Sequence, residues 1–123
     1  PFSLRVPHLF RWDQLAFDGE TVESYRRDPL CFEKTSLRFV QGLLCAQKSV
    51  LRHAQNYGYP LLMLLSPNDS IADSRSTNDF FHSYSGNREQ KKYIKSAHLL
   101  LEDQEKEDVF SDIHEWIQST ITQ

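Results

Sequence analysis

The run of large apolar residues Leu61–Leu65 constrains the fold more than any other part of the chain. Five such residues stand between Pro60 and Ser66-Pro67, which is too short for a typical helix and lacks the polar alternation of a half-buried strand. The pattern predicts a β-strand buried on both faces. Strands of this kind are typical of parallel sheets, where helices cover both faces.

The segments around this strand alternate between helix and strand from residue 36 onward. A helix is predicted over about 36–55, and a second one of about ten residues begins after Asp73. A short strand over 91–95 carries lysines, as sheet edges do, and an amphipathic helix follows over Val109–Ile121. This order predicts an α/β fold with a parallel sheet. Because an independent sheet usually needs roughly three strands, we expect the fold to be incomplete by itself.

Asp69 and His98 are the candidate catalytic residues. Asp69 lies just past the end of the first strand, and His98 follows the second strand, 29 positions later. Because the carboxyl ends of parallel strands meet at one edge of a sheet, we expect the two side chains to lie in contact there. The carboxylate can then accept a hydrogen bond from one imidazole nitrogen, which leaves the other nitrogen to take a proton from a nucleophile.

Residues 1–34 are rich in aromatic and aliphatic side chains but show neither a helical nor a strand period. Short helical turns are expected near 8–16 and 20–26, and either Asp18 or Thr21 can start the second. Two interpretations stay open, a loop that packs onto the body or a lid whose apolar face meets a hydrophobic substrate. We divide the chain into a lid or cap segment, 1–34, and an α/β section, 35–123.

Composition excludes several classes of function. The net charge of −3 and the lack of a long Lys/Arg run argue against nucleic-acid binding. No stretch reaches the roughly 18 apolar residues of a membrane span, and the first residues lack a signal-peptide pattern. Cys31 and Cys45 are too few for a metal set, so we expect free thiols packed as small apolar groups. We expect no metal, no cofactor and a location in the cytoplasm or at the membrane periphery.

From about Asp28 onward the chain resembles the carboxyl-terminal part of α/β-hydrolases of the monoacylglycerol lipase and lysophospholipase type. The resemblance is carried by Asp28-Pro29-Leu30, the helix over 36–55, Pro60–Leu65 leading to Asp69 and Asp73, Ser96-Ala97-His98, and the amphipathic helix around Trp116. It implies that the fold is the C-terminal section of an α/β-hydrolase, with Asp69 as triad acid and His98 as triad base.

The resemblance also points to a substrate pocket and to two departures from the family pattern. Ile71 and Ala72, just past the acid, would lie near the pocket wall. The family usually has a glycine three residues before the acid and another two residues before the histidine. This chain has Ser66 and Ser96 at those positions.

The nucleophile of such an enzyme is missing. α/β-Hydrolases carry a serine in Gly-x-Ser-x-Gly, whereas Ser83-Tyr84-Ser85-Gly86 has only the trailing glycine. The chain begins at Pro1 rather than at methionine, so we expect a processed protein or one segment of a longer one. The resemblance then implies a serine carboxylic ester hydrolase for lipid-like esters, completed by an amino-terminal section on the same or a separate chain. Without the nucleophile, this chain by itself is expected not to hydrolyse esters.

Other functions fit the same residues. One is a truncated hydrolase fragment that acts as a non-catalytic interaction module. Another is an α/β-hydrolase of the epoxide hydrolase or dehalogenase type, which shares the acid and base positions and differs at the nucleophile. Contact of residues 1–34 with a membrane surface and self-association into a homo-oligomer also stay open.

Overall fold

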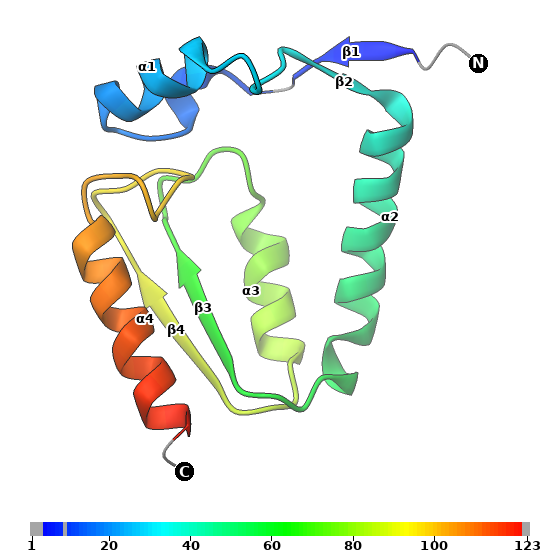
Figure 1. Cartoon of the computed structure of the whole chain (residues 1–123). Helices are drawn as coiled ribbons and strands as arrows, with labels where there is room; N and C mark the ends of the chain where they lie inside the picture. Colours follow the sequence, from blue (N-terminus) through cyan, green and yellow to red (C-terminus); the bar gives the residue numbers. More distant parts are fainter. Residues whose placement is uncertain (1–3, 9, 122–123) are drawn as a thin grey trace.

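The computed structural model describes residues 4–8 and 10–121 and contains a parallel strand pair flanked by helices (Figure 1). Strand β3 (Leu61–Leu65) pairs with β4 (Arg88–Lys92), and Leu61 lies opposite Arg88. Helix α3 (Ser74–Ser83) connects the two strands, and α4 (Lys106–Ile121) follows β4 and contacts both strands of the pair. The parallel pairing confirms the predicted α/β fold.

Helix α2 (Leu37–His53) continues into the short 3₁₀ helix η2 (Ala54–Asn56) and stands beside α3 (Figure 1). It begins after Ser36, whose hydroxyl accepts a hydrogen bond from the backbone N–H of Phe39 at 3.1 Å. Such a cap satisfies one of the N–H groups that a helix leaves unpaired at its start. The predicted helix over 36–55 is therefore confirmed, with its last turn wound more tightly.

The second strand lies earlier in the chain than predicted, at Arg88–Lys92 rather than 91–95. Its sequence, Arg-Glu-Gln-Lys-Lys, has no apolar pattern. Its polar side chains instead form hydrogen bonds with residues on both neighbouring helices. Lys91 Nζ lies 2.7 Å from Asp112 Oδ1 on α4, and Gln90 Nε2 lies 3.4 Å from Asn78 Oδ1 on α3. The strand is stabilised by its pairing with β3 and by these contacts, so a hydrophobic pattern in the sequence does not predict it.

Strand β3 is less buried than predicted. All five of its residues are half-buried instead of buried on both faces. Among the described residues β3 pairs only with β4, so its other edge has no strand beside it. The core is correspondingly small, and its buried apolar residues are Leu15, Ala16, Ala54, Tyr84, Tyr93, Ala97 and Val109.

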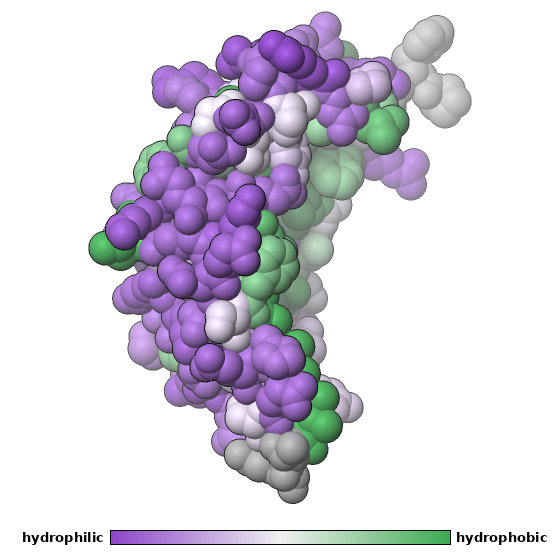
Figure 2. Space-filling model, turned by 60° about the vertical axis from the view of Figure 1, so that its left-hand side comes forward, coloured by the Kyte–Doolittle hydropathy of each residue, from purple (hydrophilic) through white to green (hydrophobic). Residues whose placement is uncertain are grey.

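Much apolar surface on α2 is uncovered. The sequence places Leu37, Val40, Leu44, Leu51 and Ala54 near one face of this helix. Ala54 is buried and Val40 is half-buried, but the three leucines are exposed because no described element covers them. Cys45 is exposed on the same helix, against the expectation of a packed thiol, whereas Cys31 is half-buried; both are free. By contrast, the face of the molecule that carries α4 is mostly hydrophilic, with apolar residues gathered along one edge (Figure 2).

The segment before α2 contains more regular structure than its sequence suggests. Its elements are β1 (Arg5–Pro7), η1 (Trp12–Gln14), α1 (Gly19–Arg27) and β2 (Lys34–Ser36), and β1 pairs antiparallel with β2. Asp18 starts α1 as predicted, accepting from the N–H of Thr21 at 2.8 Å. The β1–β2 pair was not predicted, since strands this short show no period. Residues 1–3 and 9 of the predicted 1–34 segment lie outside the described residues.

Tyr93 links the end of β4 to α4, and its loss should destabilise the fold. The buried ring donates its hydroxyl to Asp112 Oδ2 at 2.7 Å. Because a hydrogen bond to a charged group is lost, we expect Tyr93→Phe to lower the free energy of unfolding of the protein by about 1.5–3 kcal/mol. Urea unfolding at neutral pH measures this, with Tyr59→Phe, whose ring is exposed, as the control.

The same contact gives the Tyr93 contribution a pH dependence. Burial, followed by the hydrogen bond to the Asp112 carboxylate, raises the pKa of Tyr93 above its usual 10.0. The folded state therefore favours the neutral phenol, so this stabilisation is complete below the usual pKa and is lost as the pH rises above it. The difference between wild type and Tyr93→Phe should shrink in alkaline solution. Equal stabilities at neutral pH would show that the Asp112 contact contributes nothing.

Candidate active site

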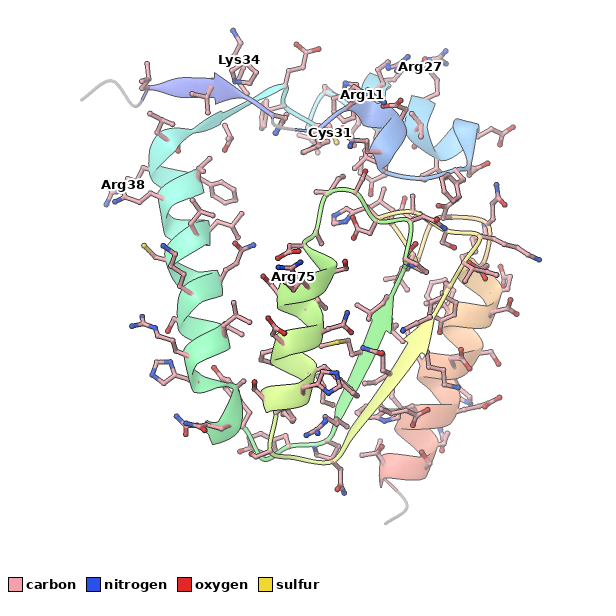
Figure 3. The ribbon with its side chains drawn as sticks, turned by 180° about the vertical axis from the view of Figure 1, so that it is seen from behind. Arg11, Arg27, Cys31, Lys34, Arg38 and Arg75 are labelled. Carbon is pink, nitrogen blue, oxygen red and sulfur yellow. The ribbon has the colours of Figure 1, made fainter. Side chains whose placement is uncertain are left out.

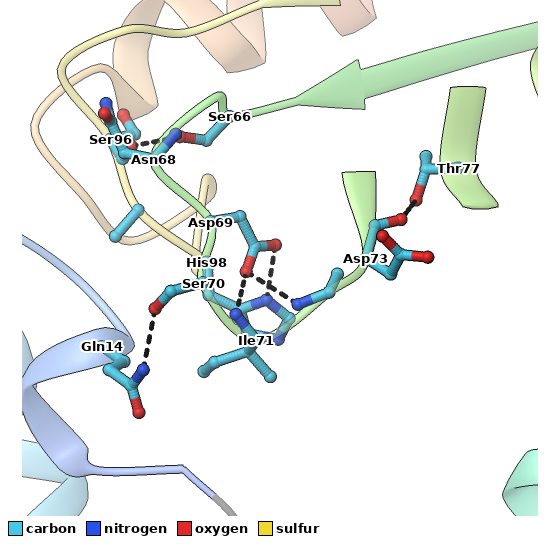
Figure 4. Close-up of polar contacts among 12 residues, drawn as sticks. Gln14, Ser66, Asn68, Asp69, Ser70, Ile71, Asp73, Thr77, Ser96 and His98 are labelled. Carbon is cyan, nitrogen blue, oxygen red and sulfur yellow. Dashed lines mark hydrogen bonds and ion pairs between the residues drawn. The ribbon is translucent and has the colours of Figure 1, made fainter. Parts of the chain in front are cut away.

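Asp69 lies in the loop that leaves the carboxyl end of β3. Its backbone N–H donates to the carbonyl of Ser66 at 3.3 Å, which turns the chain after the strand. Its side-chain Oδ1 accepts from the N–H groups of Ile71 at 2.8 Å and Ala72 at 3.0 Å. These bonds hold the carboxylate so that Oδ2 faces the loop after β4 (Figure 4).

His98 lies in that second loop and meets the carboxylate. Its Nδ1 is 2.8 Å from Asp69 Oδ2, and both side chains are partly shielded from solvent. This is the contact that the two strand-end positions predict. With Nδ1 bonded to Asp69, the Nε2 atom on the opposite side of the ring is left to serve a third group.

The surroundings of Asp69 favour its charged form. Burial raises the pKa of this carboxyl, but the N–H groups of Ala72 and Ile71 and the bond from His98 outweigh it. The pKa of Asp69 therefore lies below its usual 3.8. An ionised carboxylate beside an imidazole is an arrangement that fixes the tautomer of the ring and favours its charged form.

A pocket of about 500 Å³ opens beside the pair. Asp69 and His98 line it together with Leu64, Leu65, Ala72 and Leu100. A second hollow of about 730 Å³, the α2–α3 groove, lies between these helices and is lined by Ile71 and Ala72. Of the two residues predicted near a substrate pocket, Ala72 lines both hollows and Ile71 lines only the α2–α3 groove. Their backbone N–H groups also hold Asp69, which the sequence did not indicate.

The two serines that replace family glycines bind each other. The hydroxyl of Ser66 donates to the carbonyl of Ser96 and accepts from the N–H of Asn68 at 3.0 Å. The hydroxyl of Ser96 donates to Glu105 Oε2 at 2.9 Å. Both serines are buried, with 7% and 0% of their surface exposed. The acid loop and the base loop are therefore joined directly, and the two departures from the family pattern were the signal for it.

The segment before α2 reaches both loops. Gln14 Nε2 donates to the hydroxyl of Ser70, next to Asp69, at 2.9 Å (Figure 4). On α1, the hydroxyls of Thr21 and Tyr25 donate to the carbonyl and the carboxylate of Glu102, each at 2.9 Å. These bonds dock residues 14–25 over the loop that carries His98.

Residues 4–8 and 10–121 hold neither a cluster of metal ligands nor a membrane-spanning helix. Within these ranges no group of three or more His, Cys, Asp or Glu side chains could hold a metal ion. The helices of the same ranges include none with the length and apolar character of a membrane-spanning segment.

A comparison of the sequence with models of protein families identifies the family of this chain. A model of the family described as "Serine aminopeptidase, S33" matches residues 3–105 of the 123. The chain belongs to this family. Asp69 and His98 of this S33-family chain both lie within the matched residues. No curated protein matches the chain at a significant level.

Solved structures show the fold. A monoacylglycerol lipase from Paleococcus ferrophilus superimposes with a TM-score of 0.84 at 20% identity, covering 96% of this chain and 47% of the lipase. A soluble variant of monoglyceride lipase from Saccharomyces cerevisiae, in complex with a substrate analogue, gives a TM-score of 0.82 at 16% identity, covering 95% and 44%. The S33-family chain thus has part of an α/β-hydrolase fold and spans about half the length of these lipases.

Proposed function

We propose that this chain supplies the acid and the base of a Ser-His-Asp triad in a carboxylic ester hydrolase whose serine lies outside residues 1–123. The proposal rests on the bond between His98 Nδ1 and Asp69 Oδ2, 2.8 Å long, at the edge of a pocket. His98 Nε2 takes the proton of the serine as it attacks the ester carbonyl, and later returns it to the leaving alcohol. Asp69 holds the ring and stabilises its charged form.

An amino-terminal section would supply the serine, on the same or a separate chain. The uncovered side chains on α2 and the strand-free edge of β3 among the described residues support such a partner. So does the extent of the similar lipases, of which this chain covers 47% and 44%. Residues 1–123 by themselves are then inactive, because no acyl-enzyme forms without the nucleophile.

The substrate is a lipid-like ester in this proposal. The pocket beside Asp69 and His98 is lined in part by apolar side chains, namely Leu64, Leu65, Ala72 and Leu100. The segment before α2 exposes Leu30 (79%) and Phe32 (68%). In this proposal the segment is a lid, and these side chains touch a membrane surface where such esters reside. The two similar structures are named as lipases of monoacylglycerols, which agrees with this substrate class.

Labelling with a fluorophosphonate probe tests the nucleophile. We expect the full-length protein to react at one serine outside residues 1–123 and to lose p-nitrophenyl ester hydrolysis in parallel, because the probe traps a serine activated by His98. His98→Ala should abolish both, and the exposed His82→Ala is the matched control.

The result also separates the alternatives. Ester hydrolysis that persists in an unlabelled protein would exclude a serine triad. Release of halide or diol products without labelling would indicate the dehalogenase or epoxide hydrolase type. A protein with no hydrolytic activity and no labelling would leave the interaction module as the function.

A further inference from the structure

We propose that Asp103 is a positioning residue that fixes His98 by joining its loop to residues 15–18. The proposal rests on the triad assigned above and adds a residue that does not touch substrate. Asp103 lies between His98 and α4 and exposes only 2% of its surface.

The carboxylate of Asp103 gathers backbone N–H groups from three stretches of chain. On the lid side, Phe17 N lies 3.0 and 2.9 Å from Oδ1 and Oδ2, and Asp18 N lies 3.0 Å from Oδ1. On the side of the histidine, Ala97 N donates to Oδ2 at 2.7 Å. Gln104 N adds a bond of 2.9 Å to Oδ1. A buried charge is stable only when hydrogen bonds replace its water, and these four groups do so.

These contacts fix the backbone on both sides of His98. The preceding residue, Ala97, is held by Asp103, and the following residue, Leu99, donates its N–H to the carbonyl of Leu15 at 2.8 Å. Leu15 and Ala16 are buried, so the segment that provides these partners is itself packed. With Asp69 holding the ring, His98 is fixed at its side chain and at both of its neighbours.

An amide cannot replace this carboxylate. Four N–H groups converge on two oxygens that together offer about four acceptor sites, whereas asparagine keeps one oxygen and turns an NH₂ donor toward other donors. Asp103→Asn should therefore release Ala97 or the 17–18 stretch. Because a displacement of about 1 Å can cost about 100-fold in rate, a small shift of His98 is enough to slow proton transfer.

The test compares Asp103→Asn with Asp103→Glu in the full-length protein. For Asn we expect kcat for p-nitrophenyl ester hydrolysis to fall about 10- to 100-fold with KM little changed, because ground-state binding does not use His98. The proton of His98 bound to Asp69, which resonates far downfield in NMR, should shift or broaden. Glu, which keeps the charge and both oxygens, should restore part of kcat and of the signal.

Asp112→Asn is the matched control for lost stability. Asp112 lies on α4, outside the site, and its carboxylate bonds Lys91 and Tyr93. The substitution removes the charge of that carboxylate. We expect a lower unfolding midpoint with wild-type kcat and an unchanged His98 signal. If Asp103→Asn also keeps wild-type kcat and signal, or if Asp112→Asn reproduces its losses at equal stability, the positioning role is overturned.

A measurement on the wild type covers the case in which Asp103→Asn does not fold. Hydrogen exchange of the amides of Phe17, Asp18 and Ala97 should occur through one shared opening, because one carboxylate holds all three. Exchange of Ala97 through an opening that leaves Phe17 and Asp18 protected would overturn the proposal. These outcomes are distinct from failure of the proposed function, which would appear as full activity in the His98→Ala variant.

Discussion

We expect Asp69→Asn to lower kcat for ester hydrolysis by the full-length protein about 10⁴-fold, the loss known for this change in serine proteases, with a much smaller effect on KM. The amide keeps the shape of the side chain but loses the charge that stabilises the imidazolium. It can also present its NH₂ group to Nδ1, which leaves the proton on Nε2, where the base must be free. Steady-state kinetics with p-nitrophenyl esters measure the change.

The chain provides a closely matched control four positions away. Asp73 caps α3 by accepting the N–H groups of Arg75 and Ser76, each at 3.2 Å, just as Asp69 accepts those of Ile71 and Ala72. Asn caps helices about as well as Asp, so Asp73→Asn should retain its activity. A similar loss in both variants would mean that Asp69 acts by shaping the loop, and the triad assignment would fail.

The second large effect concerns the uncovered side of α2. Leu44 is 51% exposed and lines the α2–α3 groove. If an amino-terminal section covers this groove, Leu44→Asp places an unpaired charge in an apolar interface, and we expect the full-length protein to lose about 3 kcal/mol or more of stability. Thermal unfolding, soluble yield and esterase activity report the loss.

Arg38→Asp distinguishes burial from a general effect of charge. Arg38 lies on the same helix and points away from α3 (Figure 3), and its replacement changes the charge more than that of Leu44 does. As a surface change, it should alter stability by only about 0.5 kcal/mol. A Leu44→Asp protein as stable as the Arg38→Asp protein would show that the groove faces solvent, which contradicts the proposed amino-terminal partner.

The sequence predicts the parts of the fold that depend on local patterns. Leu61–Leu65 and Asp73 predict β3 and the start of α3, and strand-end geometry brings Asp69 to His98. The sequence pattern places β4 a few residues too late, because this strand consists of polar residues such as Lys91 that are held by tertiary contacts. The burial predicted for β3 was wrong because covering elements are lacking among the described residues.

The residues that position His98 could not be predicted from local sequence patterns. Acidic residues over 102–108 suit the start of a helix, and Glu107 and Asp108 do lie in the first turn of α4. Asp103 lies before that helix, and its carboxylate accepts hydrogen bonds from backbone N–H groups that are 85 and 86 positions away in the sequence. No spacing rule connects a carboxylate to such distant backbone groups, so only the folded chain reveals its role.

The pairing of β1 with β2 makes the intervening chain a closed loop. Its ends are joined by the ladder that places Arg5 opposite Ser36, while residues 14–18 are tied to the site. Since the entropy of closing a loop grows slowly with length, the exposed turn at 28–30 can gain or lose residues at small cost to stability. Related chains can thus differ in the size of this loop while the geometry of Asp69 and His98 stays the same.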